Sequence, residues 1–314
     1  MVMTICVMGE AIADLVPSSN GLYDPKVGGS PFNFARCLAR LGAPVRYVSP
    51  VSIDALGERM LSEMQSQGIA FDSANRSSLP TSLALVAYEE GQPRYSLYRQ
   101  GIADTDFSVM QVLDQVPLET QIFHTGSLML VPDVIDRVAS LLEELRTRGV
   151  IISLDLNLRP GVVQGDQQEY SRKILALLPL ADVVKASDED LMLLGLDADS
   201  LEQVAEQYFP DSLLVFTRGS EGARACIAGR QVSVPAFRVS HVQDTIGAGD
   251  TFYGAFMAQL YQVAGQRDCW DEEGLLSRAL QIACAAAAIN VTRVGCVPPA
   301  IEEIEAVIEG RVKL

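Results

Sequence analysis

The stretch DTIGAGDTFYGAF (residues 244–256) dominates the interpretation of this chain. It places a glycine-rich turn, with Gly247 and Gly249, directly before a helical pattern of small and apolar residues. Such a turn lets backbone N–H groups converge, and the helix that follows adds its positive dipole end, so the turn suits an anion. A tight turn with Asp250 as the helix N-cap is the structural alternative, and at this point both interpretations stand.

The spacing of the glycines excludes the better-known phosphate-binding motifs. The chain has no G-x-x-x-x-G-K-[ST] sequence, and Gly247, Gly249 and Gly254 do not fit G-x-G-x-x-G. A dinucleotide-dependent dehydrogenase is disfavoured as well, because the first apolar run leads into GEAIAD (residues 9–14) without the glycine fingerprint.

Composition narrows the class of protein. The 314 residues, 48% of them hydrophobic, suffice for one large domain or two smaller ones. Asp and Glu number 40 against 24 Lys and Arg, without a basic cluster, which argues against nucleic acid or an anionic membrane as a partner. The chain lacks an apolar run of about 18 residues and a basic, cleavable N-terminal signal, so we expect a cytoplasmic protein. The six cysteines show no metal-ligand spacing and are expected to be mostly buried thiols.

Short apolar runs alternate with helical patterns along the chain. This rhythm predicts a largely parallel sheet with helices on both faces. The expected helices include one from Pro31 to Gly42, one from Pro132 to Gly149 and a buried Ala-rich helix at 279–295. The expected strands lie at residues 4–9, 45–50, 121–126, 150–155 and 212–217.

Two segments break this rhythm. Residues 12–28 and 81–99 each have the pattern of two strands around a turn. We therefore expect a small β-structured appendage inserted into the α/β body.

The residues quoted first closely resemble the second signature of the ribokinase/PfkB sugar-kinase family, D-T-x-G-A-G-D followed by a small-residue helix. GGSPFNFA (28–35), followed by LARLG (38–42), is similar to the first signature. The resemblance extends from Gly9 to the Pro298-Pro299 region. Segments that look like the fructokinase branch in particular are GEAIADLVP (9–17), FHTGSLML (123–130), SLDLNLRP (153–160), VKASDEDLMLLG (184–195) and FTRGSEGA (216–223).

The resemblance implies a Rossmann-like, three-layer ribokinase fold with a small β-sheet lid. Residues 12–33 and 81–104 would form the lid, which in this family often also makes a homodimer contact. Residues 1–11, 34–80 and 105–314 would form the α/β core that binds nucleotide and sugar. The implied activity is ATP-dependent phosphorylation of a sugar hydroxyl.

By resemblance, Asp250 is the general base that takes the proton of the sugar hydroxyl. The N–H groups of Gly247, Ala248 and Gly249 would form an anion hole for the transferring phosphoryl group. The segment at Asp244 would contribute to a potassium site, partly through backbone carbonyls.

For ATP and Mg²⁺, the family uses an N-x-x-E element, which reads Ser187-Asp188-Glu189-Asp190 here. Asp190 replaces the usual glutamate and would act on Mg²⁺ through water, while a solvated acid at a helix N-terminus is the alternative. Arg159, in a D-x-N-x-R element, would reach a phosphate; Lys185 would do so or form a surface ion pair. The other expected nucleotide-binding residues are Ser187, Thr217, Gly219 and Gly222, a simple turn being the alternative for the two glycines.

The substrate-binding positions of the family match Asp14, Gly28, Gly29 and Asn33. Asp14 is the strongest, because a carboxylate near the lid accepts two neighbouring hydroxyl hydrogens. Related kinases carry substrate-facing groups at Arg99 and Asp104, although an exposed hairpin arginine is the plain alternative for Arg99.

We therefore expect a kinase acting on the 6-hydroxyl of D-fructose. A 2-keto-3-deoxygluconate kinase is the next hypothesis, kept open by Arg99 as a cation for its carboxylate, and a ribokinase or nucleoside kinase follows. A non-catalytic sugar or nucleotide sensor is the hypothesis from another class. His124 precedes Gly126-Ser127, but no G-x-S-x-G elbow surrounds Ser127, so we interpret His124 as a strand-end residue.

Overall fold

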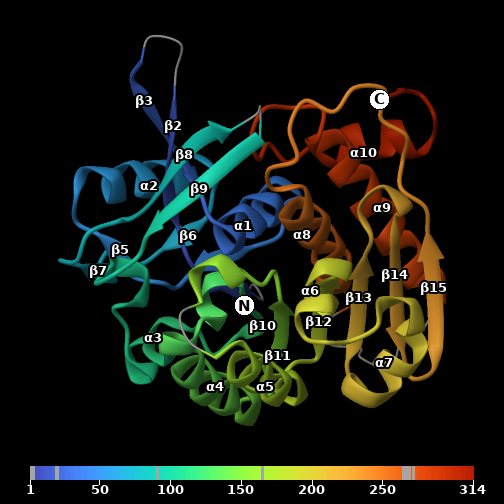
Figure 1. The fold of residues 1–314 in the computed structure, drawn as a ribbon, viewed down its shortest axis with the longest axis horizontal. Coiled ribbons are helices and arrows are strands. Elements are labelled where there is room, and N and C mark those ends of the chain that lie inside the picture. Colours follow the sequence, from blue (N-terminus) through green and yellow to red (C-terminus); the bar gives the residue numbers. More distant parts are fainter. Residues whose placement is uncertain (1–3, 18–20, 90–91, 164–165, 264–269, 271–272) are drawn as a thin grey trace.

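The computed structural model describes residues 4–17, 21–89, 92–163, 166–263, 270 and 273–314. A nine-stranded sheet forms its centre, in the order β15-β14-β13-β12-β11-β10-β1-β4-β6 (Figure 1). The strands from β13 to β6 are parallel, and β14 and β15 add an antiparallel edge. The bounds are β1 (Thr4–Val7), β4 (Val45–Tyr47), β6 (Ala70–Phe71), β10 (Thr120–Gly126), β11 (Ile151–Asp155), β12 (Val183–Ser187), β13 (Leu213–Thr217), β14 (Ala223–Ile227) and β15 (Arg230–Val234).

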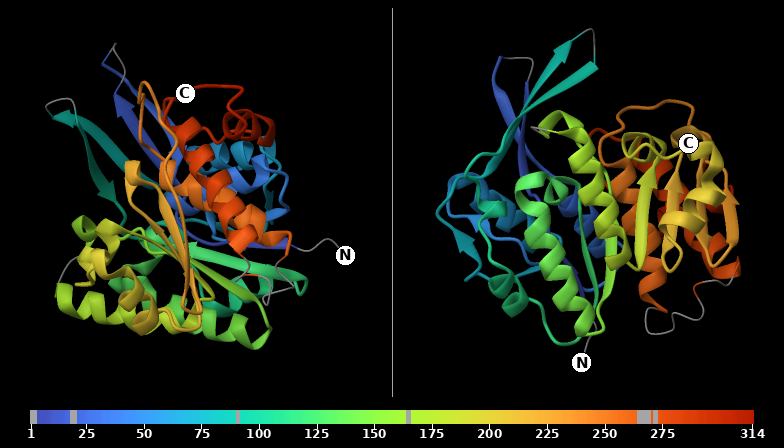
Figure 2. Two further views of the ribbon diagram at one scale, coloured as in Figure 1. Left: turned by 90° about the vertical axis from the view of Figure 1, so that its right-hand side faces the viewer. Right: turned by 60° about the horizontal axis from the view of Figure 1, so that its bottom comes forward.

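Helices cover both faces of this sheet, as Figure 2 shows, because its strands are apolar on both sides. In β1, Ile5 and Val7 belong to one buried cluster while Cys6 belongs to the other. The first cluster includes α1 (Ser30–Arg40), α2 (Ala55–Ser66), α8 (Ala248–Tyr261), α9 (Glu273–Asn290) and α10 (Ile301–Ile308). The second includes α3 (Val109–Gln115), α4 (Pro132–Thr147), α5 (Gln167–Leu177), α6 (Asp188–Leu193) and α7 (Leu201–Tyr208).

A separate four-stranded sheet, called the lid below, projects from this body (Figure 1). Its order is β3-β2-β8-β9, with two antiparallel hairpins joined by the parallel pair β2 and β8. The bounds are β2 (Ile12–Pro17), β3 (Tyr23–Gly28), β8 (Ser82–Glu89) and β9 (Gln92–Tyr98). One lid face packs onto the core where Ile12 and Ala84 meet Leu128. A short pair, β5 (Val51–Ser52) and β7 (Arg76–Ser77), lies at the edge of the body.

The structure confirms the expected α/β body and the small inserted sheet. All five expected apolar runs form strands, and the Ala-rich helix ends at Asn290 rather than at residue 295. The exact lid boundaries stay a prediction, although residues 30–33 already lie in α1. No helix among the described residues is long and apolar enough to cross a membrane. Five cysteines are buried and free as expected, and Cys269 lies outside the described residues.

Candidate active site

Two helix N-termini converge above the carboxyl ends of the central strands. Helices α1 and α8 pack side by side, and their close approach depends on Gly254. A Cβ atom on Gly254 would lie 2.7 Å from Cys37 Cβ and 3.1 Å from the carbonyl oxygen of Phe34. A side chain at this position would therefore push the two helices apart.

The glycine-rich turn is the entry to α8. Gly247 is the N-cap with φ 70°, in the left-handed region, and a Cβ there would lie 2.5 Å from Cys296 Sγ. Asp250 is the third residue of the helix, so the alternative of Asp250 as N-cap is wrong. The backbone N–H of Ala248 donates to Thr245 O at 3.2 Å, which leaves that group of the expected anion hole engaged in this structure.

The carboxylate of Asp250 is buried and held by amide donors from two other elements. Its Oδ2 accepts from Asn33 Nδ2 at 2.9 Å, and its Oδ1 lies 3.4 Å from Asn157 Nδ2. Burial raises the pKa of Asp250, while hydrogen bonds from Asn33 and Ser30 and the charges of Lys185 and Arg159 oppose the rise. A raised pKa makes Asp250 a stronger proton acceptor than an exposed aspartate.

Lys185 forms a buried ion pair and not the surface pair considered from the sequence. Its Nζ lies 3.0 Å from Asp155 Oδ1, and the side chains are only 5% and 3% exposed. Burial raises the pKa of Asp155 to about 7, against the opposing charge of Lys185. The Nζ atom would lie 3.5 Å from a Cβ on Gly249, so Lys185 places its charge beneath the first turn of α8. In this arrangement it is turned toward Asp155 rather than outward to a phosphate.

Asp190 makes structural hydrogen bonds that the sequence did not predict. Its Oδ2 accepts from the backbone N–H and the hydroxyl of Ser187, both at 2.8 Å, and its Oδ1 accepts from the N–H of Leu158 at 2.7 Å. The carboxylate is buried. Both oxygens are thus engaged and buried, so the alternative of a solvated acid is wrong, while contact with Mg²⁺ through water stays a prediction. Ser187, expected to bind nucleotide, is the N-cap of α6.

The expected metal contacts were compared with the acidic, histidine and cysteine side chains that the structure describes. Among the described residues, no group of three or more His, Cys, Asp or Glu side chains is placed to hold one. Mg²⁺ commonly keeps several waters and binds through substrate phosphates rather than through an all-protein cage. The Asp244 carboxylate accepts from the N–H groups of Ile246 and Gly295, both at 2.9 Å. A potassium ion here would depend on backbone carbonyls.

The remaining residues expected to bind nucleotide lie at or just after the carboxyl ends of β11 and β13. Thr217 ends β13, and a Cβ on Gly219, which has φ 45°, would meet open space. Local packing requires glycine at position 222, because a Cβ there would lie 2.2 Å from Val234 O. Arg159 is exposed, and its side chain makes no hydrogen bond or ion pair with the described residues, although its carbonyl oxygen accepts from the N–H of Val162 at 3.1 Å.

The residues expected to bind the sugar come from the base of the lid and the start of α1. Burial raises the pKa of Asp14, on β2, to about 6. A Cβ on Gly28 would lie 2.4 Å from Asp14 Oδ2, and one on Gly29 would lie 2.3 Å from Glu10 O. Both glycines therefore permit close approach, and the buried Asn33 Oδ1 has no hydrogen-bond partner.

Arg99 and Asp104 form a hydrogen-bonded ion pair. Arg99 Nη1 and Nη2 donate to Asp104 at 2.8 and 3.2 Å, and Nη1 also donates to Ser82 Oγ at 3.0 Å. The Arg99 side chain is 11% exposed, so the alternative of an exposed hairpin arginine is wrong. Burial raises the pKa of Asp104 despite the opposing charge of Arg99.

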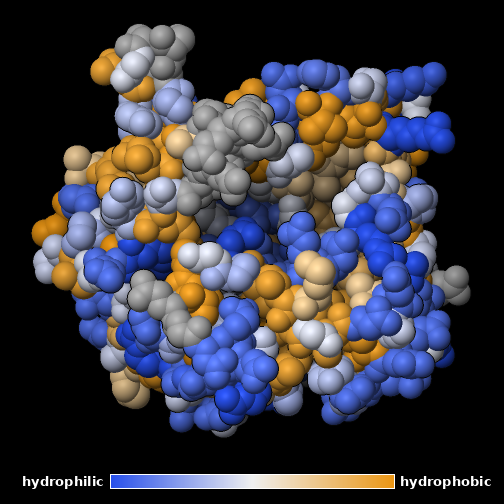
Figure 3. Space-filling model, in the orientation of Figure 1, coloured by the Kyte–Doolittle hydropathy of each residue, from blue (hydrophilic) through white to orange (hydrophobic). Residues whose placement is uncertain are grey.

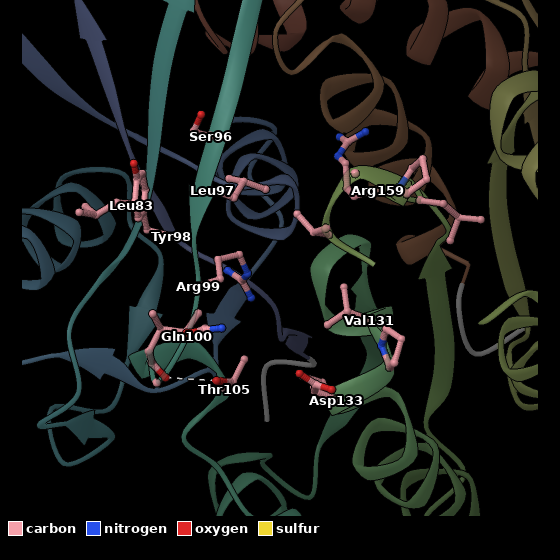
Figure 4. Close-up of a pocket in the computed structure, with 18 of the residues that line it drawn as sticks. Leu83, Ser96, Leu97, Tyr98, Arg99, Gln100, Thr105, Val131, Asp133 and Arg159 are labelled. Carbon is pink, nitrogen blue, oxygen red and sulfur yellow. Dashed lines mark hydrogen bonds between the residues drawn. The ribbon is translucent and has the colours of Figure 1, made fainter. Parts of the chain in front are cut away.

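A cleft of about 1500 Å³ separates the lid from the core. The face seen in Figure 3 is hollowed near its centre, where hydrophilic residues gather. In Figure 4, Leu97 and Arg99 border the cleft on the lid side, opposite Val131 and Arg159. The lining does not include Asp250, which is buried rather than open to the cleft.

Three residues at the site were not assigned from the sequence. Asn157 donates to Ser30 Oγ at 2.8 Å, and Glu10 Oε1 accepts from the N–H of Ser30 at 3.3 Å. Burial raises the pKa of Glu10 to about 7. The available signals were the D-x-N-x-R element for Asn157, the first signature for Ser30 and the GEAIADLVP segment for Glu10; the contact between Glu10 and Ser30 forms only in the fold.

His124 lies within β10 in the core, so its interpretation as a strand-end residue is wrong. Its Nδ1 lies 3.0 Å from Ser153 Oγ, which donates to Tyr253 Oη at 2.8 Å, and its ring stacks on Phe34 with centroids 3.6 Å apart. Burial lowers the pKa of His124 to about 3. The neutral ring belongs to the packing beneath α8.

Comparison with known proteins places this geometry in a family. The model of the pfkB family carbohydrate kinases matches residues 4–303. The chain belongs to the pfkB carbohydrate kinases. As in that family generally, it is a phosphotransferase with an alcohol group as acceptor.

Individual pfkB relatives agree over most of the chain. A fructokinase of Rhizobium leguminosarum bv. trifolii is 32% identical over 264 residues, covering 82% of this chain and 79% of the relative. The probable fructokinase-4 of Arabidopsis thaliana is 29% identical, covering 96% and 95%. The structure of a Xylella fastidiosa fructokinase with bound ATP superimposes with a TM-score of 0.89 at 30% identity, covering 99% of both chains.

Proposed function

We propose that this pfkB kinase transfers the γ-phosphoryl group of ATP to the 6-hydroxyl of D-fructose. The observation that carries the proposal is the buried Asp250 carboxylate, held by Asn33 and Asn157 at the N-terminus of α8. Fructokinases among the relatives, one of them with ATP bound, support the choice of sugar and nucleotide.

In the proposed reaction, Asp250 accepts the proton as the sugar oxygen attacks the γ-phosphorus. Phosphoryl transfer depends mainly on positioning and on stabilising charge, so a carboxylate with a moderately raised pKa suffices as base. The first-turn N–H groups of α8, at Gly249 and Asp250, lack helical acceptors and face the phosphoryl oxygens. Lys185 adds positive charge beneath this turn without leaving Asp155.

ATP is proposed to bind as its magnesium complex along the ends of β11 to β13. Arg159 is the exposed cation for a phosphate, and Thr217 and Gly219 border the nucleotide at the end of β13. Potassium is proposed to bind beside the turn through backbone carbonyls near Asp244, whose carboxylate holds that segment in place.

The sugar is proposed to lie between the lid and α1, with Asp14 and Asn33 as its hydroxyl partners. Asp14 accepts hydroxyl hydrogens, and the unpaired Oδ1 of Asn33 offers a further acceptor. Arg99 is neutralised by Asp104 and bonded to Ser82, so it offers no free charge for a substrate carboxylate. This argues for a neutral sugar over 2-keto-3-deoxygluconate.

A homodimer through the lid is proposed as the assembly. Tyr23 and Tyr98, on the two edge strands of the lid, are 50% and 60% exposed, which gives the lid large apolar groups for such a contact. Light scattering at several protein concentrations measures the assembly state.

The expected location in the cytoplasm stays a prediction.

The test of the function is ADP release across a panel of sugars with MgATP. Fructose should give the highest kcat/KM, with 2-keto-3-deoxygluconate, ribose and nucleosides far below. Asp250→Asn should lower kcat by at least about 1000-fold while the protein still binds sugar. If fructose gave no more ADP than water, the proposal would fail; if Asp250→Asn left turnover unchanged, Asp250 would not be the base.

A further inference from the structure

Asn157 occupies a strained position next to the general base. Its φ is 38°, in the left-handed region, which asparagine adopts more readily than most residues but still at a cost. Such strain persists where the surrounding structure fixes it, and it gathers at functional sites. The Nδ2 atom of Asn157 divides its two hydrogens between Ser30 Oγ at 2.8 Å and Asp250 Oδ1 at 3.4 Å.

Two hydrogen bonds fix the loop on either side of Asn157. The N–H of Leu156 donates to Lys185 O at 3.0 Å, and the N–H of Leu158 donates to Asp190 Oδ1 at 2.7 Å. The second oxygen of Asp190 is anchored at the N-cap of α6 by Ser187. A continuous chain of contacts thus runs from α6 through this loop to the base on α8.

We propose that Asn157 is a positioning residue for Asp250 and that Asp190 acts on the reaction by holding the loop of Asn157, with no part in binding Mg²⁺. This inference rests on the proposed function, in which Asp250 is the base. Under this inference, Asp190, which stands where the family has a glutamate, holds the loop that carries Asn157.

The physical reason lies in how the base is oriented. With Asn33 on Oδ2 and Asn157 on Oδ1, each carboxylate oxygen has an amide donor, so the group is fixed in rotation and its charged form is favoured. The Ser30 hydroxyl, a hydrogen-bond acceptor for Asn157, also acts to lower the pKa of Asp250. Loss of the Asn157 amide should therefore loosen the carboxylate and raise its pKa.

The main experiment compares three variants. Asn157→Gly keeps a backbone that tolerates positive φ but removes the amide, and Asn157→Asp keeps the shape but sets a second carboxylate beside the base. Ala228→Gly is the matched control, because Ala228 also has positive φ, 49°, but lies in the remote β14–β15 turn. Full steady-state kinetics are measured from pH 5 to 9 on whichever sugar the unmodified enzyme phosphorylates best.

We expect Asn157→Gly to lower kcat by about 10- to 100-fold, the range for hydrogen bonds to a charged group, with both KM values within about threefold. The acid limb of the pH profile should move to higher pH, and further in Asn157→Asp. Ala228→Gly should match the unmodified enzyme. An unchanged kcat and pH profile in Asn157→Gly would overturn the role of Asn157.

Asp190→Ala tests whether Asp190 holds the loop or binds Mg²⁺. A loop-holding role predicts a lower kcat at saturating Mg²⁺ and an unchanged Mg²⁺ requirement, with Asp190→Asn in between because its amide oxygen still accepts from Leu158. A raised Mg²⁺ requirement with full kcat at saturation would overturn it. Thermal unfolding of each variant identifies any loss of the folded state.

A readout without substrate separates this inference from the proposed function. Carboxyl ¹³C NMR titration, with the Asp250 signal assigned from Asp250→Asn, should show a higher pKa in Asn157→Gly than in the unmodified protein. An unchanged Asp250 titration would count against the inference even if fructose were a good substrate. The upward shift would support it even if the preferred sugar were another one.

Discussion

The Nδ2 atom of Asn33 lies 2.9 Å from Oδ2 of Asp250, although the two residues belong to different helices and stand 217 positions apart in the chain. One amide thus connects the segment proposed to bind the sugar with the proposed base. The same side chain keeps its buried Oδ1 without a partner, so a hydroxyl group of the sugar can complete its hydrogen bonding.

Asn33→Ala should affect both binding and chemistry. We expect the sugar KM to rise and kcat to fall, each by about tenfold, because a sugar contact and a donor to the charged base disappear together. Steady-state kinetics with fructose give both values. Asn75→Ala, whose Nδ2 donates only to Val48 O far from the site, should leave them unchanged; an effect on KM alone would separate Asn33 from the base.

Sugar binding should weaken below about pH 6 because of Asp14. Burial raises the pKa of Asp14 to about 6, so its carboxylate is charged above that pH and protonated below it. The charged form is the better acceptor for sugar hydroxyls, so the sugar KM should increase as the pH falls through about 6. Asp14→Asn should have a high KM that does not vary in this range, and a pH-dependent KM in that variant would refute the assignment.

Replacing Arg99 with methionine should destabilise the fold by about 3–5 kcal/mol, because it leaves the buried Asp104 without its partner. The double variant Arg99→Met with Asp104→Leu should recover most of this loss, since no buried charge remains. Urea unfolding gives both free energies. If Arg99 instead served a substrate carboxylate, the single variant would be nearly as stable as the unmodified protein.

Gly254→Ala should lower the free energy of unfolding by about 1–3 kcal/mol and lower kcat, since the added methyl group would press α8 away from α1. Gly274→Ala in α9 is the control, because a Cβ there meets open space and alanine favours the helix, so its stability should be equal or higher. Equal stability of both variants would show that the two helices adjust freely.

Local sequence patterns predicted the strands, the inserted sheet and the glycine-rich turn before α8, because periodicity and glycine spacing are set by neighbouring residues. These local patterns did not predict the hydrogen bonds of Asp190 or the burial of Arg99. The Asp190 carboxylate accepts a hydrogen bond from the N–H of Leu158, 32 residues earlier, and the packing of the lid base decides whether Arg99 is buried. Asn157 was visible within a motif, but its left-handed backbone was not.

Asp250, the proposed base, and its amide donors lie on α1, α8 and the loop after β11, whereas Asp14 lies on β2 of the lid. In the proposed site, Asn33 serves both the base and the sugar, whereas Asp14 is a sugar contact from the lid alone. Substitutions in β2 and β8 can change which sugar is accepted while the acceptor of the proton keeps its place. A scaffold divided in this way is well suited to directed evolution toward new polyols, with the lid strands as the region to randomise.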